Sequence, residues 1–173
     1  MRADAERNRA KVIEAAMTAF AKDGLSVPVA EIGRRAGVGT GTVSRHFPTK
    51  ESLYEAIVLA RVEEIVGEAE RLLAVAPPGE AFFRFFAYMV GQAAANRGLA
   101  EALSGGGFDV EAAGGRTGRA LEGIEQRLLV DAQAAGTVRA DATRDDVKAL
   151  LGACVAAPDR ARMIEIVTTG LRP

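Results

Sequence analysis

A run of polar side chains between residues 40 and 50 holds the functional groups through which this chain could recognise another molecule. The run offers hydroxyl groups, a glycine and three nitrogen-bearing side chains: Thr40, Gly41, Thr42, Ser44, Arg45, His46 and Lys50. Such groups donate hydrogen bonds to phosphate oxygens and to the base edges of the DNA major groove. Catalysis by His46 has little support, because the sequence suggests no nucleophile or carboxylate partner for it. A buried or helix-capping role is the alternative for His46 and Lys50.

Two short helices joined by a tight turn are expected to position this run. In residues 28–36, Val29, Ile32 and Ala36 share one helical face. Pro28 suits the first turn of that helix, because a first-turn N–H has no partner inside the helix. Gly37 should end the helix, since glycine enters the left-handed region without a steric penalty.

The second helix should begin at a cap formed by Gly39 or Thr40 and end near Phe47. Its apolar edge consists of Val43 and Phe47, which lie four residues apart. So short a helix is not stable alone, because the free energy needed to nucleate a helix exceeds the free energy gained from one or two turns of hydrogen bonds. Neighbouring helices must therefore hold it, and its polar face stays free. This pattern is typical of a helix-turn-helix whose second helix reads DNA.

Longer helices are predicted on both sides of this motif, over residues 4–22 and 50–75. The first carries an apolar stripe at helical spacing, and Thr49 should cap the second. A phosphate near the start of the second helix would meet free backbone N–H groups and the Lys50 ammonium. The large apolar residues of the region should form one small core: Ile13, Phe20, Ile32, Val43 and Phe47.

The charge is unevenly distributed along the chain. The formal net charge of the 173 residues is −1, but residues 1–50 hold nine Lys and Arg against five Asp and Glu, a net +4, so the rest carries −5. A basic region on an acidic chain is typical of a protein that meets phosphates at one end, although many soluble proteins show such imbalance by chance. Three arginines of the N-terminal arm, Arg2, Arg7 and Arg9, would either contact the DNA backbone or minor groove or be solvated.

The motifs of residues 10–57 resemble the DNA-binding domain of the TetR family of bacterial transcriptional regulators. They are the AGV turn, the reader helix ending in HF and the following PTKE, in that order. The resemblance implies an all-helical C-terminal effector domain, a homodimer on double-stranded operator DNA, repression relieved by a small ligand, and backbone contacts by His46 and Lys50. The family usually has an aromatic residue where this chain has Ser44. The alternative is therefore a helical dimeric interaction protein, or a ligand-independent regulator, with weakened DNA binding.

Composition narrows the class of protein. Hydrophobic residues make up 49% and charged residues 26%, as in ordinary globular proteins, and no apolar run approaches the length of a membrane span. One cysteine and one histidine cannot form a metal-ligand cluster, and no cofactor site is indicated. We therefore expect a cytoplasmic protein that contacts no membrane and is not an enzyme.

The sequence predicts an all-α protein in three parts: a three-helix DNA-binding domain in residues 1–49, a connecting helix in 50–76, and a helical effector-binding and dimerisation domain in 77–173. A break is expected at residues 76–79. Aromatic residues crowd the next helix, and they could line an apolar ligand pocket or simply fill a core: Phe82, Phe83, Phe86, Tyr88 and Met89. Glycine is dense over residues 99–118, which predicts a loop, either plain or covering the ligand.

Two last helices are expected over residues 144–157 and 158–171. Thr143 with Asp146 resembles a capping box at the start of the first of them. Their apolar residues lie at helical spacing: Leu150, Leu151, Val155, Met163, Ile164 and Val167. The family resemblance implies that these two helices pair with their copies in a four-helix dimer interface, and packing within the subunit is the alternative.

Overall fold

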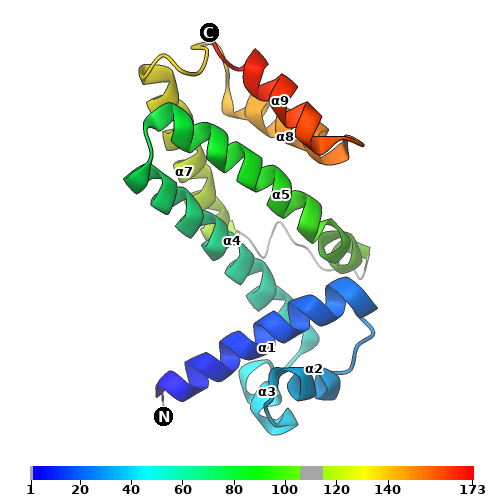
Figure 1. Ribbon diagram of the computed structural model, residues 1–173. Coiled ribbons are helices and arrows are strands. Elements are labelled where there is room, and N and C mark those ends of the chain that lie inside the picture. Colours follow the sequence, from blue (N-terminus) through cyan, green and yellow to red (C-terminus); the bar gives the residue numbers. More distant parts are fainter. Residues whose placement is uncertain (1, 106–114) are drawn as a thin grey trace. The chain divides into compact units, whose positions relative to one another are not determined.

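The computed structural model describes the backbone of residues 2–105 and 115–173, and the side chains of residues 3–97 and 118–173. The described residues are helical, as predicted, and form no strand (Figure 1). The helices are α1 (Arg2–Asp23), α2 (Val29–Ala36), α3 (Thr40–His46), α4 (Lys50–Val75), α5 (Pro78–Gly105), α7 (Gly115–Ala134), α8 (Arg144–Ala156) and α9 (Arg160–Gly170). The chain divides into two compact units: residues 1–62 with 96–115, called the head here, and residues 63–95 with 116–173, called the body.

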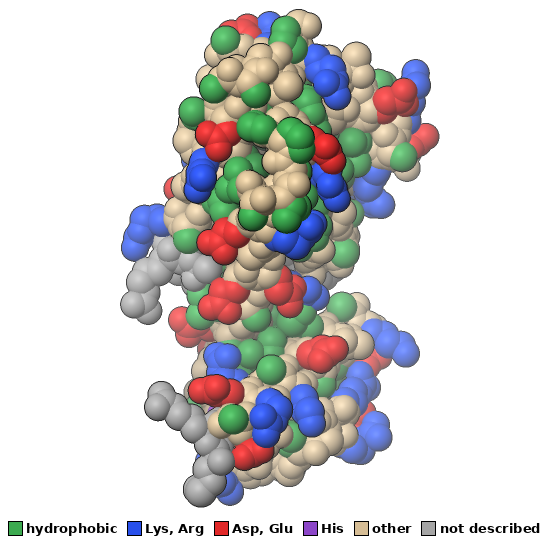
Figure 2. Space-filling model, turned by 60° about the vertical axis from the view of Figure 1, so that its left-hand side comes forward, with side chains coloured by type: hydrophobic (Ala, Val, Ile, Leu, Met, Phe, Trp, Pro, Cys, Tyr) green, Lys and Arg blue, Asp and Glu red, His purple; other side chains and the backbone are tan. Residues whose placement is uncertain are grey.

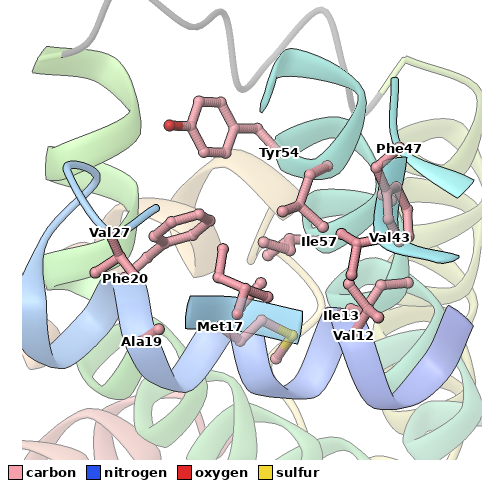
Figure 3. Close-up of a cluster of buried hydrophobic side chains, with 14 residues drawn as sticks. Val12, Ile13, Met17, Ala19, Phe20, Val27, Val43, Phe47, Tyr54 and Ile57 are labelled. Atoms are coloured by element: carbon pink, nitrogen blue, oxygen red, sulfur yellow. The ribbon is translucent and has the colours of Figure 1, made fainter. Parts of the chain in front are cut away.

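The head is built on one apolar cluster between α1, α2, α3 and the first half of α4. Figure 3 shows side chains of α1 directed toward Val43 and Ile57, and both of these residues are fully buried. The rings of Phe20 and Tyr54 meet edge to face, with centroids 5.3 Å apart. All five residues predicted for this core lie in it: Ile13, Phe20, Ile32, Val43 and Phe47.

The turn between α2 and α3 has the predicted glycine geometry. Gly37 adopts φ 68°, and its N–H donates to the Arg34 carbonyl at 3.2 Å, while the Val38 N–H donates to the Gly33 carbonyl at 2.9 Å. A Cβ on Gly33 would lie only 3.1 Å from the Val38 carbonyl oxygen and 3.2 Å from Val43 Cγ2, so α2 and α3 approach closely there.

Two details of the head differ from the prediction. Pro28 is the N-cap of α2, with extended backbone (φ −66°, ψ 145°), and is not a first-turn residue. Helix α1 already begins at Arg2, so the arginines of the expected N-terminal arm belong to its first turns.

At the start of α4, Thr49 caps as predicted: the Ser52 N–H donates to Thr49 Oγ1 at 3.1 Å and the Thr49 N–H to Ser52 Oγ at 3.3 Å.

The body packs a second apolar cluster from the second half of α4, α5, α7, α8 and α9. The expected break before α5 is shorter than predicted, because α5 starts at Pro78, where proline's missing N–H costs nothing. The predicted loop over residues 99–118 is also too long. Helix α5 continues to Gly105 and α7 begins at Gly115, while residues 106–114 lie outside the described part.

Local hydrogen bonds fix the connection from α7 to α8. Gly136 takes φ 68° after the end of α7, and the Gln133 side-chain amide donates to the carbonyls of Arg139 and Ala142 at 3.1 and 2.9 Å. The capping box at Thr143 is present: the Asp146 N–H donates to Thr143 Oγ1 at 3.2 Å, and the Thr143 N–H donates to the Asp146 carboxylate at 2.9 Å. Helices α8 and α9 then lie side by side (Figure 1). Among the described helices, none is long and apolar enough to cross a membrane.

Candidate DNA-binding surface

Helix α3 buries one side chain and presents most of the others to solvent. Val43 is fully buried against the head core, while Gly41, Ser44 and Arg45 are exposed and Thr42 is half-buried. Of the remaining predicted positions, Thr40 is exposed and His46 is half-buried. The helix has no side-chain cap, since Gly39 occupies the N-cap position. Tertiary packing through Val43 and Phe47 therefore holds the helix and leaves its polar face available.

Arg45 lies on the exposed face of α3. One terminal nitrogen of its guanidinium group is 3.9 Å from the position that a Cβ on Gly41 would take. The side chain thus folds back along the helix, over the residue one turn earlier.

Lys50 is placed at the start of α4 by a contact from another part of the head. Its Nζ donates to the Leu25 carbonyl at 3.2 Å, and the residue is half-buried. An ammonium group has three donors, so this bond leaves donors for a second acceptor. Lys50 therefore has a structural bond, and its contact with a phosphate stays a prediction.

The two arginines at the end of α2 are neutralised within the head. Arg34 makes a bidentate contact with Glu31, both N···O distances being 2.7 Å, and Arg35 bridges Glu31 at 2.8 Å and Asp23 at 2.7 Å. Hydrogen bonds from Arg34 and then Arg35 lower the pKa of Glu31 from 4.5 to about 2. These ion pairs connect the end of α1 to α2, and the two arginine charges are balanced by the two carboxylate charges. Figure 2 shows basic and acidic side chains interspersed on the lower part of the face drawn there.

The aromatic residues predicted for a ligand pocket belong to the apolar cluster of the body. Phe82 and Phe86 are buried, and Phe83, Tyr88 and Met89 pack against the cluster from partly exposed positions. The Phe82 and Phe83 rings meet edge to face at 5.2 Å, and the Arg172 guanidinium lies 4.6 Å from the Phe83 centroid. These residues are gathered as the sequence suggested, and their role in ligand binding stays a prediction.

Five of the six residues predicted for the dimer interface are half-buried on α8 and α9: Leu150, Leu151, Val155, Met163 and Ile164. Val167 is buried in the body core, with 7% of its surface exposed. Its neighbour Ile166, which sequence reasoning missed, is 52% exposed, and small residues such as Gly152 and Ala153 are exposed on α8. The five partly exposed residues pack against the body cluster within the subunit, and the dimer interface stays a prediction.

Comparison with known proteins decides the family. A family model described as "Bacterial regulatory proteins, tetR family" matches residues 12–57, and one described as "Transcriptional regulator SbtR-like, C-terminal domain" matches residues 77–173. The chain belongs to the TetR family. This confirms the resemblance of the sequence motifs and the all-α fold class. Members of the family are DNA-binding transcription factors and not enzymes, so the chain is a transcription regulator with a DNA-binding domain.

Solved structures of family members cover nearly the whole chain. A TetR transcription regulatory protein from Mycobacterium vanbaalenii is 49% identical, with a TM-score of 0.87, and the match covers 99% of each chain. A TetR transcriptional regulator from Streptomyces coelicolor is 33% identical, with a TM-score of 0.78, over 95% of this chain and 98% of the other. A gamma-butyrolactone receptor described as ArpA-like is 26% identical, with a TM-score of 0.71, over 98% of this chain and 90% of the other.

Proposed function

We propose that this TetR-family regulator binds operator DNA in a sequence-specific manner through the outer face of α3. The observation that carries the proposal is the contrast on this short helix between the fully buried Val43 and the exposed Ser44 and Arg45. Exposed hydroxyl and guanidinium groups at the end of a rigidly held helix suit base edges in the major groove. Lys50, at the start of α4, suits an adjacent phosphate. Since DNA is the partner, we place the protein in the cytoplasm.

The DNA-bound form in this proposal is a homodimer. Two copies of α3 enter successive major grooves when they lie one helical turn apart, about 34–36 Å. Exposed Ile166 on α9, together with the exposed small residues Gly152 and Ala153 on α8, supports pairing of two copies there. The operator should then be a palindrome, because a two-fold dimer presents the same reader helix to each half-site.

A small apolar effector would act through the body. The supporting feature is the aromatic set on α5, whose partly exposed members Phe83, Tyr88 and Met89 adjoin buried rings. One relative of the chain is a gamma-butyrolactone receptor, which is a protein named for a small ligand. Such an effector can release DNA only if it binds a dimer geometry that does not fit the operator more tightly than the geometry that does. The chain would then be a repressor relieved by its ligand.

Selection of duplexes from a random double-stranded library tests the DNA-binding proposal. The purified protein should enrich a palindromic motif over successive rounds, and the same motif should occur upstream of its own or a neighbouring gene. Enrichment of no motif, with binding equal on all duplexes, would contradict sequence-specific reading. A mobility shift on the enriched duplex, with and without extract of the source cells, then tests release by a small molecule.

The second candidate function, a dimeric interaction protein with weakened DNA binding, is favoured by Ser44 alone. A serine side chain covers less of a base or sugar surface than the aromatic residue usual in the family. A Ser44→Tyr variant separates the two functions. If α3 reads DNA, the variant changes affinity or the enriched motif; if the reader helix has lost its role, neither the wild type nor the variant enriches a motif.

A further inference from the structure

We infer that Arg9 of α1 is a DNA-contact residue, held over the ring of Phe47 so that its guanidinium group binds a backbone phosphate beside α3. The inference rests on the proposed function and adds to it a contact from an element outside the helix-turn-helix. It also identifies Phe47 as the positioning residue, in addition to its place in the head core.

The geometry around Phe47 is fixed. Phe47 is the C-cap of α3, its N–H donates to the Val43 carbonyl at 2.8 Å, and only 4% of its surface is exposed. The Arg9 Cζ lies 5.5 Å from the centroid of its ring, while Arg9 itself is exposed. The centroids of the His46 and Phe47 rings are 6.2 Å apart. Arg9 is thereby placed at the C-terminal end of α3, where Phe47 is the C-cap.

The charges of the head point to Arg9 as available for an anion. Arg34 and Arg35 are paired with Glu31, and Arg7 is paired with Asp4 on its own helix. Among the side chains that the structure describes, neither Arg9 nor Arg45 lies within ion-pair distance of a carboxylate. Arg9 therefore brings a full positive charge to the end of α3, whereas the arginines of α2 bring none.

A cation–π contact with Phe47 leaves the guanidinium group able to bind phosphate. The Arg9 Cζ lies over the Phe47 ring at 5.5 Å from the centroid, and the interaction of a cation with a ring face uses none of the five guanidinium N–H donors as a conventional hydrogen bond. A guanidinium group matches the oxygens of a phosphate in a bidentate arrangement, and the ring reduces the side-chain freedom that would otherwise be lost on binding. Arg9 is thus a preorganised phosphate ligand. A residue that only covered the core would not need its charge.

Lys11 provides a matched control on the same helix. It carries the same charge and is exposed, but it lies two residues further on, about 200° around the helix axis from Arg9. Replacing either residue by alanine changes the net charge of the head equally. Only the Arg9 replacement removes a cation from the end of α3.

The test is fluorescence anisotropy of the full-length protein on a labelled 30-base-pair duplex of fixed sequence, over a range of salt concentrations. For Arg9→Ala, the slope of log affinity against log salt concentration should become shallower by about one per bound subunit. One phosphate contact makes the affinity about eightfold higher at 0.1 M salt than at 1 M salt, and the variant should lose this gain. Lys11→Ala should keep the wild-type slope. Arg9→Lys should keep the slope too, because the charge remains, but bind more weakly because an ammonium group cannot bind a phosphate in a bidentate arrangement.

Three results would overturn the inference. Arg9→Ala could keep the wild-type slope, Arg9→Ala and Lys11→Ala could lose the same amount, or Arg9→Lys could behave as Arg9→Ala does. Circular dichroism melting of each variant shows whether it is folded, and Arg9→Lys retains the test if Arg9→Ala is not. A wild-type protein that binds no duplex at any salt concentration would instead refute the proposed function, and Arg9's role with it.

Discussion

Replacing Gly79 by alanine should destabilise the body, although alanine is the better helix former. Gly79 lies in the first turn of α5, against the connection between α7 and α8. A Cβ at this position would be 2.3 Å from Thr137 Oγ1, 2.5 Å from its Cβ and 2.6 Å from its Cγ2. Carbon atoms in contact prefer about 3.5–4.0 Å, so the overlap is about 1 Å. Because the Thr137 Cβ is part of the overlap, rotation of the threonine side chain cannot remove it.

The size of the effect follows from two opposing contributions. Overpacking costs about 1–3 kcal/mol, and the gain in helix propensity returns at most ~1 kcal/mol. A shift of the connection would also strain the hydrogen bond from Thr137 Oγ1 to the Ala132 carbonyl, which is 2.9 Å long. We therefore expect a net loss of about 1–2 kcal/mol in the free energy of unfolding, which corresponds to a fall of about 2–8 °C in Tm.

Urea denaturation followed by circular dichroism measures this loss, with two controls. Gly91→Ala lies on the same helix, where a Cβ meets nothing within 4 Å, so it should leave stability unchanged or raise it by up to ~1 kcal/mol. A double-mutant cycle with Thr137→Gly should show that the cost of Gly79→Ala disappears when the threonine is absent. A Gly79→Ala protein as stable as Gly91→Ala, or a cost that persists beside Thr137→Gly, would show that Thr137 does not oppose a side chain at position 79.

Three further predictions concern the head. Lys50→Ala should weaken binding similarly on all duplexes and lower the salt slope by about one per bound subunit, measured by anisotropy; loss on one operator only would contradict a phosphate contact. Val43→Ala should cost about 2 kcal/mol or more in urea unfolding and abolish DNA binding, because Val43 is fully buried and holds α3. The Glu31 pKa is lowered from 4.5 to about 2, so its contribution to stability is present above pH 4.5 and is lost as the pH falls toward 2. Glu31→Gln should therefore flatten acid unfolding in that range, and an unchanged melting profile would contradict this.

The sequence predicted those elements that depend on neighbouring residues. The α2–α3 turn at Gly37, the capping box at Thr143 and the bounds of α4 all follow from local backbone and side-chain chemistry. Over residues 99–105 the glycine signal misled the prediction, because the run Leu-Ala-Glu-Ala-Leu favours a helix more strongly than later glycines oppose it.

The contacts that shape the candidate site join residues far apart in sequence. Examples are Lys50 with the Leu25 carbonyl, Arg35 with Asp23, and Arg9 with Phe47. No spacing rule predicts them, because they depend on how helices pack. On α9, helical spacing groups Val167 with Met163 and Ile164, but it does not say that Val167 is buried in the body core.

The most direct test of the central claim, that the outer face of α3 reads DNA bases, is the specificity ratio of an Arg45→Ala variant. Affinity is measured for the selected palindromic duplex and for duplexes with single base-pair changes in each half-site. If Arg45 contacts a base edge, the variant should lose discrimination at one position in each half-site, by about 1–3 kcal/mol, and keep it elsewhere. A variant that weakens equally on every duplex, or that discriminates as well as the wild type at all positions, would contradict the account.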